Sequence, residues 1–83
     1  MAKGVIRYWA AAKDAAGVAE EPFEAETLAG LVADVTAGRE PLARVVGRSS
    51  FLVDGAPVGL RAHDAVVLPE GATVEVLPPF AGG

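Results

Sequence analysis

Hydrophobic and polar residues alternate near the start of the chain, which predicts a β-strand over Val5–Ala10. Ile6 and Tyr8 fall on one face of this strand, and Arg7 and Trp9 fall on the other. Because successive side chains of a strand point to opposite faces, the first pair is expected to be buried and the second pair to lie outside.

Two shorter segments follow this strand. Ala11–Ala16 is rich in alanine and ends at Gly17, which predicts a short helical turn closed by a left-handed glycine. Val18–Ala25 is predicted as a second strand. Pro22 lies within it and has no N–H to donate, so this strand is expected at an edge of the sheet.

The clearest helical pattern begins at Thr27, a suitable N-cap, and runs through Ala37. A shorter helical segment is predicted after Pro41 and ends at Gly47. Four apolar residues of the longer helix recur at helical spacing and form one stripe along it: Leu28, Leu31, Val32 and Val35. Such a stripe requires an apolar surface to cover it.

Turn residues divide the second half of the chain. Ser50–Val53 is predicted as a strand, and Asp54-Gly55 is a hairpin signal leading into residues 56–58. Residues 59–72 are expected to be irregular. Thr73–Leu77 is predicted as the last strand.

This order of elements predicts one α+β domain, with a mixed sheet of four to five strands and one main helix packed across it. Ile6 and Tyr8 share their inward parity with Val74 and Val76. The first and last strands are therefore expected to lie side by side.

That arrangement has consequences for the outer face of the sheet. Arg7 is expected opposite Glu75, where the two can pair, and Trp9 is expected beside Leu77. Together with Phe80, Trp9 and Leu77 are expected to form an apolar docking patch.

Composition supports a folded domain and narrows its chemistry. The chain has 83 residues, 52% of them hydrophobic, with a mean hydropathy of +0.37, which excludes a disordered class. Its net charge of −4 argues against nucleic acid as a partner. It has no cysteine and a single histidine, His63, for which no metal or catalytic role is expected. No apolar run is long enough for a membrane span, and no leader pattern opens the chain, so a cytoplasmic location is expected.

The closing segment is the most informative part of the chain. Two consecutive prolines favour an extended, stiff backbone, and two consecutive glycines have no Cβ to obstruct a narrow tunnel. Residues 1–77 are therefore expected to form the folded domain, and residues 78–83 an extended arm with a reactive terminal carboxylate. The segment reads Leu77-Pro78-Pro79-Phe80-Ala81-Gly82-Gly83.

Three stretches together resemble the MoaD/ThiS family of sulfur carriers, most closely its molybdopterin synthase small-subunit branch. They are the opening residues 7–17, the Val53-Asp54-Gly55 hairpin and the closing residues 77–83. The resemblance covers essentially the whole chain and implies a ubiquitin-like β-grasp fold.

The resemblance also implies a chemistry. An adenylating enzyme related to the ubiquitin E1 proteins would activate the Gly83 carboxylate with ATP, and a sulfur donor protein would convert the adenylate to a thiocarboxylate. The arm would then enter the molybdopterin synthase large subunit and deliver sulfur to a pyranopterin precursor. The chain itself would bind no cofactor or metal.

Site residues follow from this chemistry. Gly83, with Gly82 before it, would carry the reaction. Partner contacts would come from six residues, namely Trp9, Leu77, Pro78, Pro79, Phe80 and Ala81.

Three alternatives remain open at this point. The chain could be a sulfur carrier for thiamin, cysteine or a secondary metabolite. It could be a ubiquitin-like modifier that is attached to lysines through Gly83. It could also be a plain binding module whose outer sheet face does the work.

Overall fold

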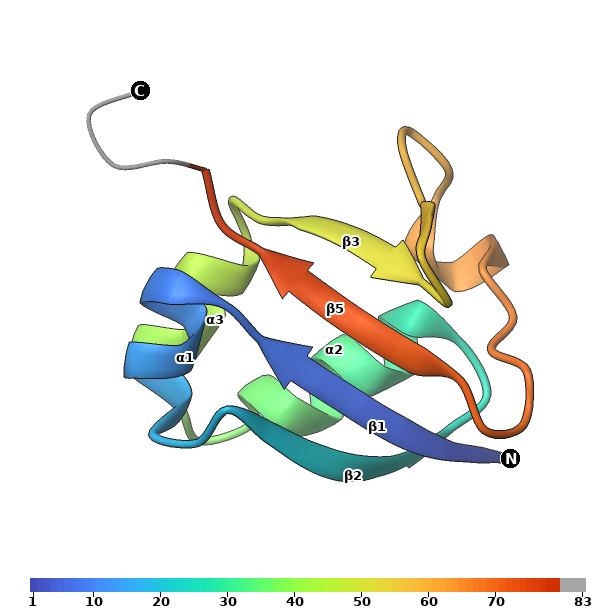
Figure 1. Cartoon of the computed structure of the whole chain (residues 1–83), viewed down its shortest axis with the longest axis horizontal. Helices are drawn as coiled ribbons and strands as arrows, with labels where there is room; N and C mark the ends of the chain where they lie inside the picture. Colours follow the sequence, from blue (N-terminus) through green and yellow to red (C-terminus); the bar gives the residue numbers. More distant parts are fainter. Residues whose placement is uncertain (80–83) are drawn as a thin grey trace.

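A computed structural model of the chain describes residues 1–79, which form a five-stranded sheet and the helices packed against it (Figure 1). The strand order is β2-β1-β5-β3-β4. In chain order, the elements are β1 (Ala2–Tyr8), α1 (Ala10–Ala16), β2 (Glu20–Ala25), α2 (Leu28–Thr36), α3 (Glu40–Val46), β3 (Ser50–Val53), β4 (Ala56–Pro57), the 3-10 turn η1 (His63–Ala65) and β5 (Thr73–Leu77).

The first and last strands lie side by side at the centre of the sheet, as their shared parity predicted. β1 and β5 are parallel, with Ile6 paired to Val74 and Tyr8 paired to Val76. The neighbours β2 and β3 run antiparallel to β1 and β5, respectively. This is the mixed sheet that the order of elements predicted, and it is the β-grasp arrangement that the resemblance implied.

The helices cover one face of the sheet and leave the other face open (Figure 1). Thr27 caps α2 as predicted, since its side-chain oxygen accepts a hydrogen bond from the backbone N–H of Gly30 at 3.1 Å. The predicted stripe of α2 faces the sheet, with Val32 only partly buried. The largest fully buried side chains are Ile6, Tyr8, Leu28, Leu31, Leu42, Val74 and Val76.

Both edges of the sheet carry a proline at an outward-facing position. Tyr8 N–H donates to the Ala19 carbonyl at 2.8 Å, so the backbone N–H and C=O groups of odd-numbered residues in β2 point toward β1. The backbone nitrogen of Pro22 therefore points away from the sheet. On the other edge, Val58 N–H donates to the Phe51 carbonyl at 3.0 Å, which turns Pro57 outward. Neither edge offers a donor at these positions, which hinders the addition of another strand.

Several predicted boundaries were wrong. The first strand covers Ala2–Tyr8 instead of Val5–Ala10, and the second begins at Glu20 instead of Val18. Ala10 is the first residue of α1 and has a φ of 49°, in the left-handed region that alanine seldom adopts. The chain therefore turns sharply out of the sheet directly after Trp9. The expected irregular stretch 59–72 also contains η1.

Candidate functional site at the base of the arm

The last strand, β5, leads into the arm, residues 78–79 of which the structure describes. Leu77 and Pro78 are partly buried and Pro79 is exposed. The other arm residues singled out from the sequence, namely Phe80, Ala81, Gly82 and Gly83, lie outside the described residues. Their roles, and the docking role of the described ones, stay predictions.

Trp9 lies next to the end of β5, although it is not a strand residue. It is the N-cap of α1, and its backbone N–H donates to the Val76 carbonyl at 3.2 Å. This bond continues the β1–β5 ladder by one residue and brings Trp9 to the level of Leu77. The Trp9 side chain keeps 46% of its surface exposed. The expected proximity of Trp9 and Leu77 therefore follows from the backbone pairing.

Two charged residues contact the Trp9 indole on the open face of the sheet. The indole Nε1 donates a hydrogen bond to Glu75 Oε1 at 3.1 Å, and the Arg7 guanidinium carbon lies 5.9 Å from the ring centroid. Arg7 Nε in turn donates to Glu20 Oε1 at 3.1 Å. These four residues form a connected group across β2, β1 and β5, which is called the Trp9 clamp below.

The clamp corrects one expectation from the sequence. Arg7 and Glu75 do lie opposite each other in the β1–β5 register. However, Arg7 forms its ion pair with Glu20, and Glu75 accepts from Trp9. The bulky indole at the strand end reaches Glu75, a contact that strand parity alone could not indicate. Glu75 and Glu20 were therefore missed as members of the site.

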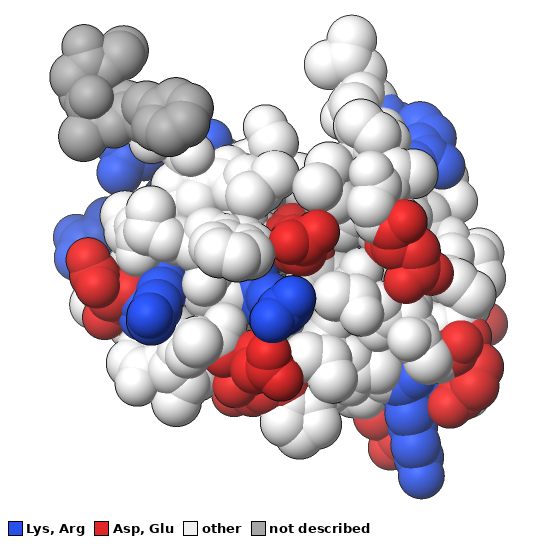
Figure 2. Space-filling view, viewed as in Figure 1, with Lys and Arg blue, Asp and Glu red and all other residues white. Residues whose placement is uncertain are grey.

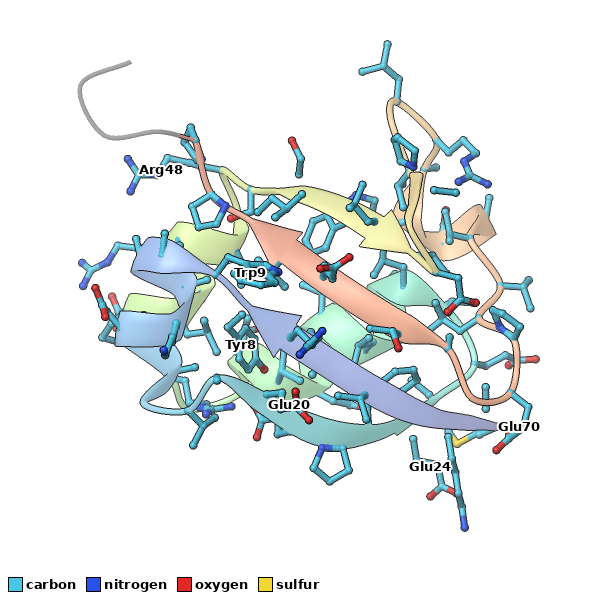
Figure 3. All side chains as sticks on the ribbon, viewed as in Figure 1. Tyr8, Trp9, Glu20, Glu24, Arg48 and Glu70 are labelled. Carbon is cyan, nitrogen blue, oxygen red and sulfur yellow. The ribbon has the colours of Figure 1, made fainter. Side chains whose placement is uncertain are left out.

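The open face around the clamp combines apolar and charged surface. Figure 2 shows acidic and basic side chains interspersed on this face, with uncharged surface between them. Figure 3 shows Trp9 alongside β5 and Glu20 on β2, with β1 between them. A face with this composition is suited to a protein partner, whose own side chains can cover the apolar parts and pair with the charges.

A pocket of about 180 Å³ lies beside the clamp. It is smaller than the sites of roughly 300–1,000 Å³ that usually bind small molecules. Its lining is Arg7, Tyr8, Trp9, Lys13, Ala19 and Glu20. Within residues 1–79, no group of three or more His, Cys, Asp or Glu side chains is arranged to hold a metal ion. The described helices also include none that could cross a membrane.

A second polar group supports the site from the helix side of the sheet. Tyr8 Oη donates to Glu21 Oε2 at 2.5 Å, and Arg39 Nη1 donates to the same oxygen at 2.8 Å. Arg39 also donates to the carbonyls of Val35 and Ala16, each at 3.1 Å. The Arg39 side chain thereby connects the ends of α1 and α2 to β2. These contacts adjoin Tyr8, the residue before Trp9.

The contacts among Tyr8, Glu21 and Arg39 shift the pKa values of Tyr8 and Glu21. Burial and the hydrogen bond to Glu21 raise the pKa of Tyr8 far above its usual value. Partial burial by itself raises the pKa of Glu21, but the hydrogen bonds from Tyr8 and Arg39 outweigh it, and the pKa of Glu21 falls below 4.5. The Glu21 carboxylate is therefore charged at neutral pH and accepts both hydrogen bonds.

Replacing Glu21 by Gln is expected to lower the free energy of unfolding at neutral pH by about 1–2 kcal/mol, because the charge-assisted bonds are weakened. A carboxylate with a lowered folded pKa stabilises above its unfolded pKa, and this stabilisation is lost as pH falls through the folded value. The difference between wild type and Glu21→Gln should therefore shrink below about pH 4.5.

Urea denaturation at several pH values measures this dependence. Glu24→Gln is the matched control, because Glu24 lies on the same strand and, among residues 1–79, its one ion pair is an exposed contact with Lys3 at 4.0 Å. A Glu21 effect that is no larger than the Glu24 effect, or one that persists at low pH, would contradict the assignment.

Comparison with known proteins identifies the family. The family model described as the ThiS family matches residues 6–83. No curated protein matches the chain significantly in sequence. Among solved structures, the small archaeal modifier protein 1 from Methanosarcina acetivorans has a TM-score of 0.86 and 22% identity, covering 100% of this chain and 98% of its own.

Two other similar structures bear names from molybdopterin synthesis. A Pyrococcus furiosus protein, assigned provisionally as molybdopterin converting factor subunit 1, has a TM-score of 0.77 and 25% identity and covers 96% of this chain and 100% of its own. One chain in the structure of a complex of subunits 1 and 2 of the molybdopterin-converting factor from Helicobacter pylori has a TM-score of 0.72 and 18% identity. The match covers 98% of this chain and 99% of that chain. The family match, which spans most of the chain, and the shared fold lead to one conclusion: this chain belongs to the ThiS family of ubiquitin-like sulfur carriers.

Proposed function

We propose that this protein carries sulfur as a thiocarboxylate on Gly83 and delivers it to the pyranopterin precursor of molybdopterin. The observation that carries the proposal is the family match over residues 6–83, which includes the Pro-Pro and Gly-Gly pairs of the arm. In this reaction the chain provides a carboxylate and a docking surface, and other proteins provide the catalytic groups.

The chemistry requires activation before sulfur can be attached. A carboxylate is a poor electrophile, so an E1-like enzyme first joins the Gly83 carboxylate to the AMP part of ATP and releases pyrophosphate. The outer sulfur of a persulfide on a donor protein then attacks the acyl carbon and forms a C–S bond, and AMP leaves. A thiol then reduces the S–S bond that still joins this sulfur to the donor, which releases the thiocarboxylate. The mixed anhydride supplies the leaving group that the free carboxylate lacks.

The arm and the open sheet face divide the work of partner recognition. Gly82 and Gly83 minimise steric hindrance when an enzyme encloses the tip, and Pro78 and Pro79 reduce the entropy lost on docking. The outward prolines of both sheet edges disfavour strand addition, which leaves the open face with Trp9 as the surface for contact. Partner contacts are therefore proposed at Trp9, Leu77, Pro78, Pro79, Phe80 and Ala81.

The molybdopterin branch is supported by the Helicobacter pylori neighbour, in which subunit 1 of the converting factor is complexed with subunit 2. The corresponding partner of this chain would be a molybdopterin synthase large subunit. A transfer assay tests this choice. The thiocarboxylated protein is mixed with that large subunit and the pyranopterin precursor, and dithiolene formation is measured.

Formation of the dithiolene, with return of the terminus to a carboxylate, is the expected result. A thiocarboxylate that is consumed only by a thiazole-forming or cysteine-forming system would assign the carrier to another pathway. Asp34 is exposed on α2, on the helix side of the sheet, so Asp34→Asn offers a control that should transfer sulfur at the wild-type rate.

A second function is favoured by a specific neighbour. The Methanosarcina acetivorans structure is a small archaeal modifier protein, and its TM-score is higher than those of the two molybdopterin-related structures described above. In this alternative, lysine amines attack the activated Gly83 carbonyl and form isopeptide bonds. High-mass conjugates that resist thiols, and that disappear when Gly83 is removed, would support the modifier function.

A further inference from the structure

We infer that Arg7, Glu20 and Glu75 are positioning residues that hold the Trp9 indole in one orientation at the base of the arm. The inference rests on the proposed function, because the oriented indole is assigned to the partner that activates the arm. It concerns the contacts of Glu75 with Trp9 and of Glu20 with Arg7, which strand parity does not indicate.

The two contacts of the indole restrict different motions. The hydrogen bond from Nε1 to Glu75 fixes the edge of the ring, at 3.1 Å. Arg7 lies over the ring, 5.9 Å from its centroid, and restricts rotation of its face. Because Trp has only two side-chain torsions, an edge contact and a face contact together select one rotamer.

The ion pair with Glu20 restricts the position of the Arg7 side chain. The Glu20 carboxylate accepts from Arg7 Nε at 3.1 Å, which holds the guanidinium above the sheet between β2 and Trp9. Both side chains are about half exposed, at 48% and 51%, so this ion pair adds little to stability. Its consequence is geometric, since it limits the positions that Arg7 can take beside the indole.

The backbone of Trp9 is constrained as well. Its N–H is bonded to the Val76 carbonyl at 3.2 Å, and Ala10 follows with a φ of 49°. Backbone strain next to a half-exposed aromatic residue is typical of a position held for binding. Arg7 is paired with Glu20 and with Glu75 in the strand register, so these side chains share one face of the sheet. It is the face that the helices leave open (Figure 1).

A preoriented indole lowers the cost of association. An immobilised side chain with free rotamers costs roughly 0.5–1.5 kcal/mol on binding, which corresponds to about 2- to 12-fold in affinity. We therefore expect loss of the clamp to weaken partner binding without changing the reaction at Gly83.

The first test uses the free protein, because Trp9 is the single tryptophan of the chain. Glu75→Ala should shift the emission maximum of Trp9 to longer wavelength and speed its anisotropy decay. Glu75→Gln keeps an acceptor oxygen and should stay close to wild type. Lys3→Ala, on the same strand and face as Arg7 but distant from Trp9, is the matched control for Arg7→Ala.

The second test measures activation kinetics by pyrophosphate release from ATP in the presence of an E1-like adenylating enzyme. Glu75→Ala and Arg7→Ala should each raise the KM for this protein roughly fivefold, with kcat within about twofold of wild type. In a Trp9→Ala background, Glu75→Ala should have no further effect, because its consequence is transmitted through the indole.

Two results would overturn the inference. One is unchanged Trp9 fluorescence in both Glu75→Ala and Arg7→Ala. The other is a KM increase that is undiminished in the Trp9→Ala background, which would mean that Glu75 contacts the partner directly. Failure of the wild-type protein to be activated at all would contradict the proposed function instead, and the fluorescence of the free protein would still decide the clamp.

Discussion

Removal of Gly83 is expected to abolish thiocarboxylate formation completely while leaving the fold intact. The proposed reactive carbon belongs to Gly83, and the shortened chain would present the carboxylate of Gly82 one residue too early for the activating site. The last strand ends at Leu77, and within residues 1–79 the buried apolar residues lie between Ile6 and Val76. Thermal denaturation should therefore give the wild-type Tm, whereas intact mass after incubation with the activating enzyme should show no sulfur.

A more conservative change separates length from shape. Gly82→Val keeps the length of the arm but adds a branched side chain beside the reactive residue, and it should reduce loading strongly with the same Tm. Gly30→Ala is the control on the body, because Gly30 lies in α2, has no positive φ and leaves ordinary contact space for a Cβ, so loading should be unchanged. Normal loading of the chain without Gly83 would refute the proposed role of that residue.

Replacement of Leu31 by Ala is expected to lower the free energy of unfolding by about 2–5 kcal/mol. Leu31 is completely buried at the centre of the α2 stripe, and its removal leaves a cavity between the helix and the sheet. Domains of this size have only a small total stability, so the variant should be partly unfolded at moderate temperature. Urea denaturation, followed by circular dichroism, measures the difference.

Val32 provides the comparison on the same helix. It is the next residue, but it is only partly buried, so Val32→Ala should cost considerably less than Leu31→Ala. Equal losses for the two variants would show that the helix does not pack against the sheet through the face that contains Leu31.

Strand and helix positions were predictable wherever burial alternated regularly. β3 and β5 have the predicted bounds, because turns or prolines border both segments and their apolar residues alternate or run together. Pro22 located the edge strand, since a proline there loses no ladder bond. The pairing of the central strands followed from parity, because a sheet with one covered face requires its apolar residues on the same side.

The turn at Trp9 and Ala10 was not predictable in the same way. Positive φ is expected at glycine or asparagine, whereas here it occurs at an alanine within an alanine-rich stretch. The predicted first strand therefore continues to Ala10, two residues beyond the end of β1 at Tyr8. Trp9 was still placed next to Leu77, because the backbone bond to Val76 continues the ladder for one residue beyond the strand.

The polar contacts depend on side-chain reach, which periodicity does not encode. Arg39 is 18 residues from Glu21 in the sequence, and they meet only because β2 and the end of α2 are adjacent in the fold. Glu75 could be assigned to the outer face, but its choice of Trp9 over Arg7 depends on the length of the indole. The arm, in contrast, stays a prediction from proline and glycine, whose effects on the backbone are local.

The central claim, that Gly83 carries sulfur for other proteins, is tested most directly by intact mass spectrometry. The wild-type protein is incubated with an E1-like adenylating enzyme, ATP and a sulfur donor, and the terminal peptide is then fragmented. The account predicts the mass increase of one oxygen replaced by sulfur, located at Gly83 and dependent on ATP. An unchanged mass under conditions in which another carrier of the family is loaded would contradict it.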